Sequence, residues 1–134
     1  MSKKEEYKLR NEQFIANKKK DENVKELRGG VLYEVIASGD SDRTPGPRNI
    51  VTLHYKGSTI NGKVFDETFS SGCPSAFRVN ELISGFQIAL VNMHIGDHWR
   101  VFIPSEMGYG SRGAGRDIPG DSALIFEIQL IAIG

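Results

Sequence analysis

The residues of this chain that could take part in chemistry are one carboxylate and a set of aromatic rings. Asp66 directly follows Phe65 in the run Gly62-Lys63-Val64-Phe65-Asp66. A carboxylate among rings must accept hydrogen bonds to stay charged. The pattern therefore predicts a site that works by burial and shape. The rings are Tyr55, Phe65, Phe77, Phe86, Trp99, Tyr109 and Phe126.

The sequence predicts neither a metal site nor a reactive nucleophile. His94 and His98 are four residues apart, but Gly96 lies between them and no third ligand is near. The single cysteine, Cys73, lies in a polar segment without a neighbour that would activate its thiol, so we interpret it as a free surface cysteine. No serine stands in the sequence context of a nucleophile elbow. We expect no metal and no covalent intermediate.

One stretch of glycines matches a cofactor motif by letter only. Gly108-Tyr109-Gly110-Ser111-Arg112-Gly113 has the form G-x-G-x-x-G. A dinucleotide site needs a strand before this motif and the start of a helix after it. Residues 114–120 contain two more glycines and a proline, which do not begin a helix. We interpret these glycines as the means by which a long loop folds tightly, and we expect no cofactor.

Length and composition indicate a small soluble protein with one domain and an appendage. The chain has 134 residues, of which 39% are hydrophobic and 25% are charged. No apolar run approaches the length of a membrane span, and no apolar stretch follows the charged N-terminus as in a signal peptide. We therefore expect a cytoplasmic protein that does not enter a membrane, with the periplasm as the alternative if a leader has been removed.

The net charge of zero conceals an uneven distribution. Residues 1–28 hold nine Lys and Arg against six Asp and Glu, whereas residues 29–134 hold eight against eleven. The longer part is thus mildly acidic and has no basic stripe, so we expect no nucleic-acid partner. The short run Lys18-Lys19-Lys20 precedes Asp21 and Glu22 and predicts a solvated helix face.

Residues 1–28 are predicted to form an N-terminal helical extension. Residues 3–27 contain no Gly or Pro and are rich in Lys, Glu, Gln, Asn and Ala. Their apolar positions are so few that burial alone would stabilise such a helix little. Three alternatives stay open at this point: the helix packs on a partner, packs on the edge of its own domain, or frays.

Residues 29–134 are predicted to form an α+β domain with an antiparallel sheet. Asn61-Gly62 predicts a two-residue type I′ hairpin turn, in which both central residues have positive φ. Ser84 and Gln87 have the spacing of a capping box at the start of one short amphipathic helix, residues 84–91. A long Gly-rich loop, residues 104–121, precedes the last strand. The expected strands are residues 31–36, 50–55, 63–68, 77–79, 98–103 and 123–133.

Taken in order, these segments resemble the FKBP-type peptidyl-prolyl cis-trans isomerases. The similarity extends over about residues 29–133 and is specific as a set. The extension resembles, in shorter form, the region before this domain in bacterial members with N-terminal dimerisation helices, which implies a homodimer through residues 1–28. The matching motifs are His54-Tyr55-Lys56-Gly57, Asn61-Gly62-Lys63-Val64-Phe65-Asp66, Phe77-Arg78-Val79, residues 81–86, residues 96–104, residues 109–115 and Ile118-Pro119 followed by residues 123–126.

The resemblance implies a twisted antiparallel sheet wrapped around the short helix, with an apolar groove between them. Asp66, Tyr109 and Phe126 are carried over by motif as the catalytic residues. The substrate-binding residues carried over in the same way are Tyr55, Phe65, Phe77, Leu82, Ile83, Phe86 and Ile118. Three positions depart from the usual family pattern: Phe86 replaces Trp, Ser75 replaces a larger side chain, and Asp117 replaces an apolar residue.

The activity implied by the resemblance is peptidyl-prolyl cis-trans isomerisation without a cofactor. Proline-containing polypeptides would be the substrates and FK506-type macrolides would be ligands of the groove. Two alternatives stay open: a module that binds proline-containing chains without catalysis, and a chaperone-like interaction protein that acts through its helical extension. The chaperone reading has less support, because residues 109–121 are too few to hold the folded insertion of chaperone-type members.

Overall fold

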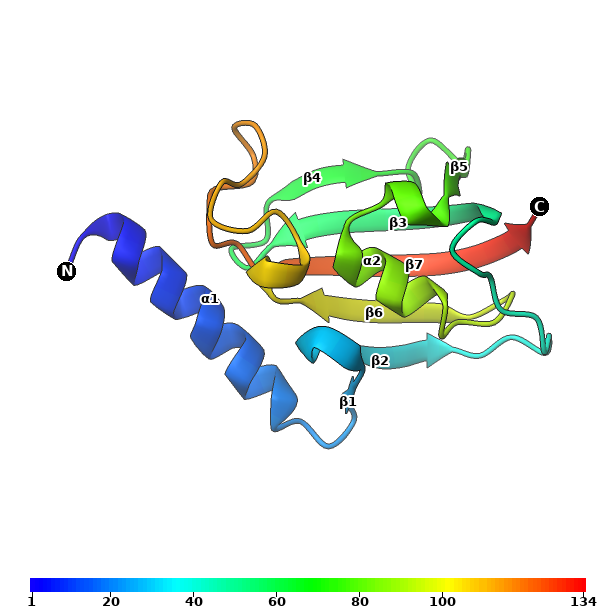
Figure 1. Ribbon diagram of the computed structural model, residues 1–134, viewed down its shortest axis with the longest axis horizontal. Helices are drawn as coiled ribbons and strands as arrows, with labels where there is room; N and C mark the ends of the chain where they lie inside the picture. The colour runs from blue at the N-terminus through cyan, green and yellow to red at the C-terminus, as the bar shows by residue number, and fades with distance from the viewer.

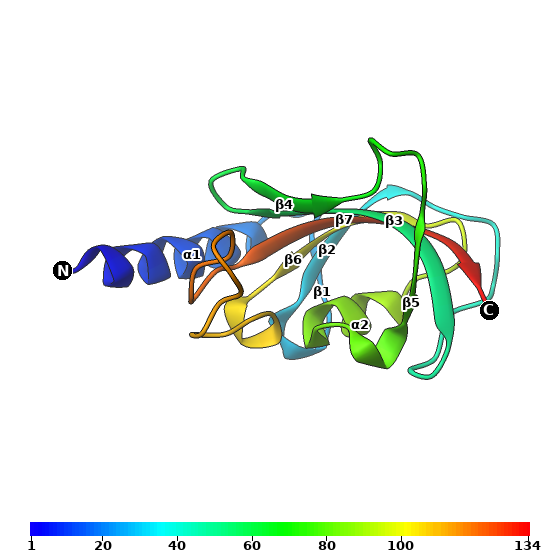
Figure 2. The same cartoon turned by 90° about the horizontal axis from the view of Figure 1, so that it is seen from above.

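The computed structural model describes residues 1–134 and shows a seven-stranded antiparallel sheet that curves over one short helix (Figure 1, Figure 2). This architecture confirms the expected α+β fold. The helices are α1 (Lys3–Lys19) and α2 (Ser84–Leu90), and the strands are β1 (Lys25–Glu26), β2 (Leu32–Ala37), β3 (Ile50–Thr59), β4 (Val64–Glu67), β5 (Ser75–Arg78), β6 (His98–Ile103) and β7 (Leu124–Ile133). Short 3₁₀ turns lie at Arg28–Gly30, Val79–Glu81 and Ser105–Met107.

The last strand, β7, lies inside the sheet and organises the pairing. The strand order is β1-β2-β6-β7-β3-β4, and β5 pairs with the first residues of β3. β7 alternates as the sequence predicts, with Leu124, Phe126, Ile128 and Leu130 buried and the residues between them half exposed. β3 is long enough to pair with β5 near its start and with β4 near its end. One continuous strand, β3, therefore positions both β5 and β4.

The hydrophobic core fills the space between the concave face of the sheet and α2. Phe86, Ala89 and Leu90 of α2 are buried there. Gly85 lets this helix approach β6, because a Cβ atom at Gly85 would lie 2.4 Å from Cγ2 of Ile103. The single tryptophan, Trp99, stacks on Tyr33 with ring centroids 4.0 Å apart.

The start of α2 differs from the predicted capping box. The N-cap residue is Ile83, and no side chain caps the helix. Ser84 is the first helical residue, and the side chain of Gln87 donates instead to the carbonyl oxygen of Leu82 at 2.6 Å. The capping-box prediction was wrong because the helix begins one residue earlier than the spacing requires, which makes Ser84 the first helical residue and not the N-cap.

The hairpin turn between β3 and β4 also differs from the type I′ turn that was predicted. Gly62 has a φ of 87°, but Asn61 is not among the residues with positive φ. The N–H of Gly62 donates to the carbonyl of Thr59 at 3.0 Å, and the N–H of Thr59 donates to the carbonyl of Lys63 at 3.1 Å. This is a longer loop in which a turn centred on Ile60 and Asn61 is followed by a left-handed glycine.

The N-terminal helix is shorter than predicted and packs on its own chain. α1 ends at Lys19, and Lys25–Glu26 form a small strand that pairs with β2. The ring of Phe14 meets the ring of Phe102 edge to face, with centroids 6.0 Å apart. Phe102 points away from the core cluster that holds its neighbours Val101 and Ile103, so α1 covers part of the opposite face of the sheet. Neither helix combines the length and apolar character that crossing a membrane requires.

Candidate active site

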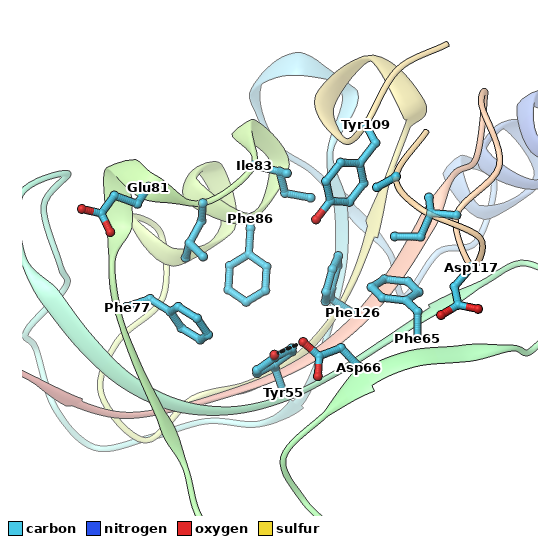
Figure 3. A pocket seen from close by; sticks show the side chains of 13 residues that line it. Tyr55, Phe65, Asp66, Phe77, Glu81, Ile83, Phe86, Tyr109, Asp117 and Phe126 are labelled. Atoms are coloured by element: carbon cyan, nitrogen blue, oxygen red, sulfur yellow. Dashed lines mark hydrogen bonds between the residues drawn. The ribbon is translucent and has the colours of Figure 1, made fainter. Parts of the chain in front are cut away.

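A cavity of about 480 Å³ opens between α2, the sheet and the long loop (Figure 3). Its volume lies in the range of ordinary ligand pockets. All ten site residues expected from the sequence line it, together with three that were not expected: Glu81, Ala114 and Asp117. Their individual roles in catalysis stay predictions. The ten are Tyr55, Phe65, Asp66, Phe77, Leu82, Ile83, Phe86, Tyr109, Ile118 and Phe126.

Five of the rings form an unbroken edge-to-face series across the floor and walls of the cavity (Figure 3). Each comes from a different element: β5, β3, α2, β7 and β4. Such pairs contribute about 0.5–1.5 kcal/mol each beyond the area they bury, so the elements hold the rings in fixed positions. The centroid distances are 5.7 Å for Phe77 to Tyr55, 6.3 Å for Tyr55 to Phe86, 5.0 Å for Phe86 to Phe126 and 5.7 Å for Phe126 to Phe65.

Gly57 shapes the cavity, although the sequence alone did not identify it as a site residue. A Cβ atom at Gly57 would lie 2.6 Å from Cζ of Phe65 and 2.7 Å from Cε1 of Phe126. Gly57 sits opposite Phe126 on β7 and opposite Asp66 on β4. The absence of its side chain therefore makes room for two rings of the cavity. Strand register could have identified Gly57, because it pairs Gly57 with Phe126 and with Asp66, the residue next to Phe65.

Tyr55 and Asp66 form the polar centre of the cavity. The hydroxyl of Tyr55 donates a hydrogen bond to the Asp66 carboxylate. Burial, reinforced by this bond and by the charge of Asp66, raises the pKa of Tyr55 well above its ordinary value. The phenol therefore stays protonated and remains a donor, and it fixes the orientation of the carboxylate.

Two further donors of the cavity have no partner within the chain. The Tyr109 hydroxyl makes no hydrogen bond to another residue, and Figure 3 shows it pointing into the cavity above Phe86 and Phe126. The backbone N–H of Ile83 precedes the first residue of α2 and likewise bonds to no other group of the protein. Each can therefore donate to a carbonyl oxygen of a molecule that enters the cavity.

The rim of the cavity is acidic. Glu81 and Asp117 join Asp66 among the lining residues, and no Lys, Arg or His lines the cavity. Asp117 pairs with Lys63 at 2.9 Å, which links the long loop to the β3–β4 hairpin. Ser75, which replaces a larger side chain of the usual family pattern, does not line the cavity.

The Gly-rich loop closes on itself and does not start a helix. A Cβ atom at Gly113 would lie 2.3 Å from the carbonyl oxygen of Ile118, and one at Gly120 would lie 2.1 Å from that of Ser111. Ala114 and Ile118 form an isolated antiparallel bridge. The glycines thus permit the tight closure expected of them, and the closed loop carries Tyr109, Ala114 and Ile118 to the cavity.

The fold and the cavity define a class of protein in which a curved antiparallel sheet and one short helix enclose a ring-lined groove. The sequence pattern of the FKBP-type peptidyl-prolyl cis-trans isomerases matches residues 41–131. The chain belongs to this family. A crystal structure of a peptidyl-prolyl cis-trans isomerase from Pseudomonas syringae superposes with a TM-score of 0.91 at 36% identity, covering 100% of this chain and 98% of that one.

Two curated bacterial relatives are longer than this chain. The FKBP-type 22 kDa peptidyl-prolyl cis-trans isomerase of Escherichia coli is 38% identical over 90% of this chain and 58% of its own length. The outer membrane protein MIP of Legionella longbeachae is 37% identical over 96% of this chain and 55% of its own length. The chain thus spans little more than half the length of these relatives.

Proposed function

We propose that this chain is a peptidyl-prolyl cis-trans isomerase, with residues 29–134 as the catalytic domain and residues 1–28 as an extension. The observation that carries the proposal is the cavity of about 480 Å³, in which packed rings surround one oriented carboxylate and two unpaired donors. Family membership supports the same activity. The substrates are proline-containing polypeptides.

The mechanism requires no covalent chemistry. A peptide bond resists rotation by about 18–20 kcal/mol because rotation breaks its resonance. The half-rotated amide has lost this conjugation and is less polar along its C–N bond, so an apolar groove stabilises it relative to the planar form. Each tenfold acceleration requires only about 1.4 kcal/mol of such preferential stabilisation.

Each group of the cavity has a separate part in this mechanism. The prolyl ring packs against Phe86 and Phe126, which holds one side of the rotating bond. Tyr109 and the N–H of Ile83 donate to carbonyl groups of the substrate on the other side. Asp66, oriented by Tyr55, faces the carbonyl that swings during rotation.

A protease-coupled assay on a proline peptide tests the proposal. We expect Asp66→Asn and Tyr109→Phe each to lower kcat/KM by about tenfold, which corresponds to about 1.4 kcal/mol. Tyr33→Phe is the matched control, because Tyr33 stacks on Trp99 outside the cavity, and it should keep the wild-type rate. Phe126→Leu should reduce kcat/KM further if it folds normally. Full activity in a folded Phe126→Leu protein would contradict the mechanism.

A non-catalytic proline-binding module is the second candidate, and the Phe86 position favours it. Phenylalanine gives the cavity less ring area than the tryptophan usual in the family and offers no indole N–H. The same peptide separates the two functions: binding without acceleration supports the module, and acceleration supports the enzyme.

FK506-type macrolides are proposed as ligands of the same cavity. Its rings and the two unpaired donors suit a bulky, carbonyl-rich, apolar molecule. Titration followed by nuclear magnetic resonance should shift the amides of Ile83, Tyr109 and Ile118, whereas Lys25 and Glu26 of β1 should not respond. A cytoplasmic location stays a prediction from the sequence. Homodimerisation through residues 1–28 also stays untested, and the packing of α1 on its own chain argues against it.

A further inference from the structure

The N-terminal helix is attached to the body through a buried polar residue. Asn11 is the one buried residue of α1 and is only 2% exposed. Its side-chain oxygen accepts the backbone N–H of Ala123 at 2.8 Å, and its side-chain nitrogen donates to the carbonyl of Tyr7 at 2.7 Å. Both polar ends of the amide are therefore satisfied, so the contact fixes the helix in one position against the chain.

A second contact runs from α1 into the long loop. The hydroxyl of Ser122 lies 2.6 Å from the carbonyl oxygen of Pro119 and 2.7 Å from the hydroxyl of Tyr7. Because Ser122 has one hydroxyl hydrogen and a carbonyl only accepts, Ser122 donates to Pro119 and Tyr7 donates to Ser122. The result is a directed relay from Tyr7 through Ser122 to the backbone of Pro119.

The relay ends next to the cavity. Pro119 follows Ile118, which lines the cavity and is 6% exposed. The neighbouring Asp121 is the only non-glycine residue with positive φ, and its N–H donates to the carbonyl of Gly110 at 2.9 Å. Gly110 in turn follows Tyr109. The bond between Asp121 and Gly110 thus joins the two ends of the loop next to Ser122 and Ala123, which α1 contacts. Figure 1 shows this loop between the end of β6 and the start of β7.

We propose that Tyr7 and Asn11 are positioning residues for the isomerase site. They hold the closed form of residues 109–122 and thereby place Ile118 and the hydroxyl of Tyr109 over the rings. The N-terminal extension then contributes to substrate binding without touching the substrate. This inference rests on the proposed isomerase function.

The first test compares two substitutions on the same helix in the full chain. Tyr7→Phe removes only the hydroxyl that donates to Ser122. One such bond contributes about 0.5–1.5 kcal/mol, so we expect about a two- to tenfold rise in KM with a smaller change in kcat. Phe14→Leu is the matched control, because Phe14 contacts Phe102 on the opposite face of the sheet. It should lower the free energy of unfolding and leave KM unchanged.

A double-mutant cycle tests the relay itself. Ser122→Ala should raise KM like Tyr7→Phe, and the two substitutions together should have no more effect than Ser122→Ala alone. Asn11→Ala should also raise KM, because it removes the bond that joins α1 to Ala123 and leaves the buried N–H of Ala123 without a partner. Additive effects of Tyr7→Phe and Ser122→Ala, or a KM in Tyr7→Phe equal to that of Phe14→Leu, would overturn the proposal.

A measurement without substrate separates this inference from the proposed activity. Amide hydrogen exchange at residues 110–118 should become faster in Tyr7→Phe and stay unchanged in Phe14→Leu. If the wild-type chain has no isomerase activity but exchange differs between the two variants as expected, the proposed activity is refuted. The inference that Tyr7 and Asn11 hold residues 109–122 then still stands. If exchange at residues 110–118 is the same in both variants, the inference that α1 holds this loop is refuted.

Discussion

The chemistry assigned to this protein depends on side chains that are held in place. Asp66 has no acid–base partner in the cavity other than the phenol of Tyr55, which stays a donor. The Tyr109 hydroxyl and the Ile83 N–H are free to bond to a guest. Such a site suits a reaction in which a bond turns and no proton is transferred.

The Tyr55–Asp66 pair should make stability depend on alkaline pH. In the unfolded chain Tyr55 loses its proton near pH 10, whereas in the folded chain its raised pKa retains it. The unfolded state then binds fewer protons, so the free energy of unfolding falls as the pH rises above about 10. Denaturant unfolding followed by circular dichroism should show a shallower alkaline decline in Tyr55→Phe than in wild type.

Asp66→Asn provides the intermediate case for this measurement. It removes the charge and the strong acceptor but leaves the phenol buried, so its alkaline decline should lie between those of wild type and Tyr55→Phe. Identical pH profiles for wild type, Tyr55→Phe and Asp66→Asn would contradict the assignment of the raised Tyr55 pKa to its burial beside Asp66.

The acidic rim should influence which peptides the site prefers. Glu81 and Asp117 line the cavity, whereas the cations paired with them, Arg78 at 3.8 Å and Lys63 at 2.9 Å, do not. Exposed charge pairs contribute about 0.2–1 kcal/mol, so we expect kcat/KM about two- to fivefold higher for a peptide with Lys before Pro than for one with Glu. The ratio should shrink in high salt and in the double variant Glu81→Gln, Asp117→Asn.

Glu106→Gln is the matched control for either single substitution, Glu81→Gln or Asp117→Asn, because it removes one negative charge outside the cavity. An equal loss of preference in this variant would show that net charge, and not the rim, attracts the peptide. A peptide with Leu before Pro reports activity independently of charge.

At the scale of the elements, the close contact of β3 with the rings is the most sensitive point. Gly57→Ala should push the rings of Phe65 and Phe126 apart and destabilise the protein by about 1–3 kcal/mol, as overpacking does. It should also lower kcat/KM, because both rings line the cavity. Calorimetry and the peptide assay measure the two effects.

Gly46→Ala is the control for this substitution. Gly46 does not have positive φ, and a Cβ atom there would meet its nearest neighbour, Oδ1 of Asn49, at an ordinary 3.5 Å. It should leave both stability and activity nearly unchanged. If Gly57→Ala behaves in the same way, the floor of the cavity is more deformable than the packing indicates.

Most of the strands and ten side chains of the cavity could be predicted from the sequence, but the order of the strands in the sheet and local backbone details could not. Alternation gave β6 with the correct ends, and matched motifs gave ten of the lining side chains. The predictions of a type I′ turn at Asn61 and of a capping box at Ser84 were wrong, because a shift of one residue changes the type of turn and the identity of the N-cap. Glu81, Ala114 and Asp117 were not expected in the lining because they lie in a 3₁₀ turn and in the long loop, whose paths strand alternation does not predict.

The sequence left open whether α1 packs on its own domain, on a partner or on nothing, for a different reason. The helix was judged by its sparse apolar stripe, yet its buried residue is Asn11 and its other anchor is the hydroxyl of Tyr7. Hydrogen bonds of this kind depend on a partner more than a hundred residues away, which no local pattern reveals. The end at Lys19 was missed because strand β1 forms only by pairing with β2.

At the scale of the whole molecule, the packing of α1 bears on self-association. Phe14 and Asn11 are used within the chain, and Leu9 is the large apolar side chain that α1 itself leaves exposed, at 43%. A stable dimer buries about 1,200–2,000 Å², which one leucine does not provide. We expect light scattering at micromolar concentration to give the monomer mass of 14.8 kDa.

A mass of twice this value at micromolar concentration would instead support the homodimer implied by the family resemblance. Leu9→Glu would then locate the contact, because a charge on the exposed face of α1 should dissociate such a dimer without disturbing Phe14 or Asn11. The variant Val64→Glu, with an exposed apolar side chain on β4, is the control for a charge placed elsewhere.

The position of the single indole has a practical consequence. Trp99 is stacked on Tyr33 and is only 5% exposed, whereas Phe86 occupies the floor of the groove. The intrinsic fluorescence of Trp99 therefore reports whether the β2–β6 region is folded, and ligand binding in the cavity should not change it. A Phe86→Trp variant would introduce a chromophore where ligands settle, and excitation at one wavelength would then follow occupancy and unfolding in the same sample.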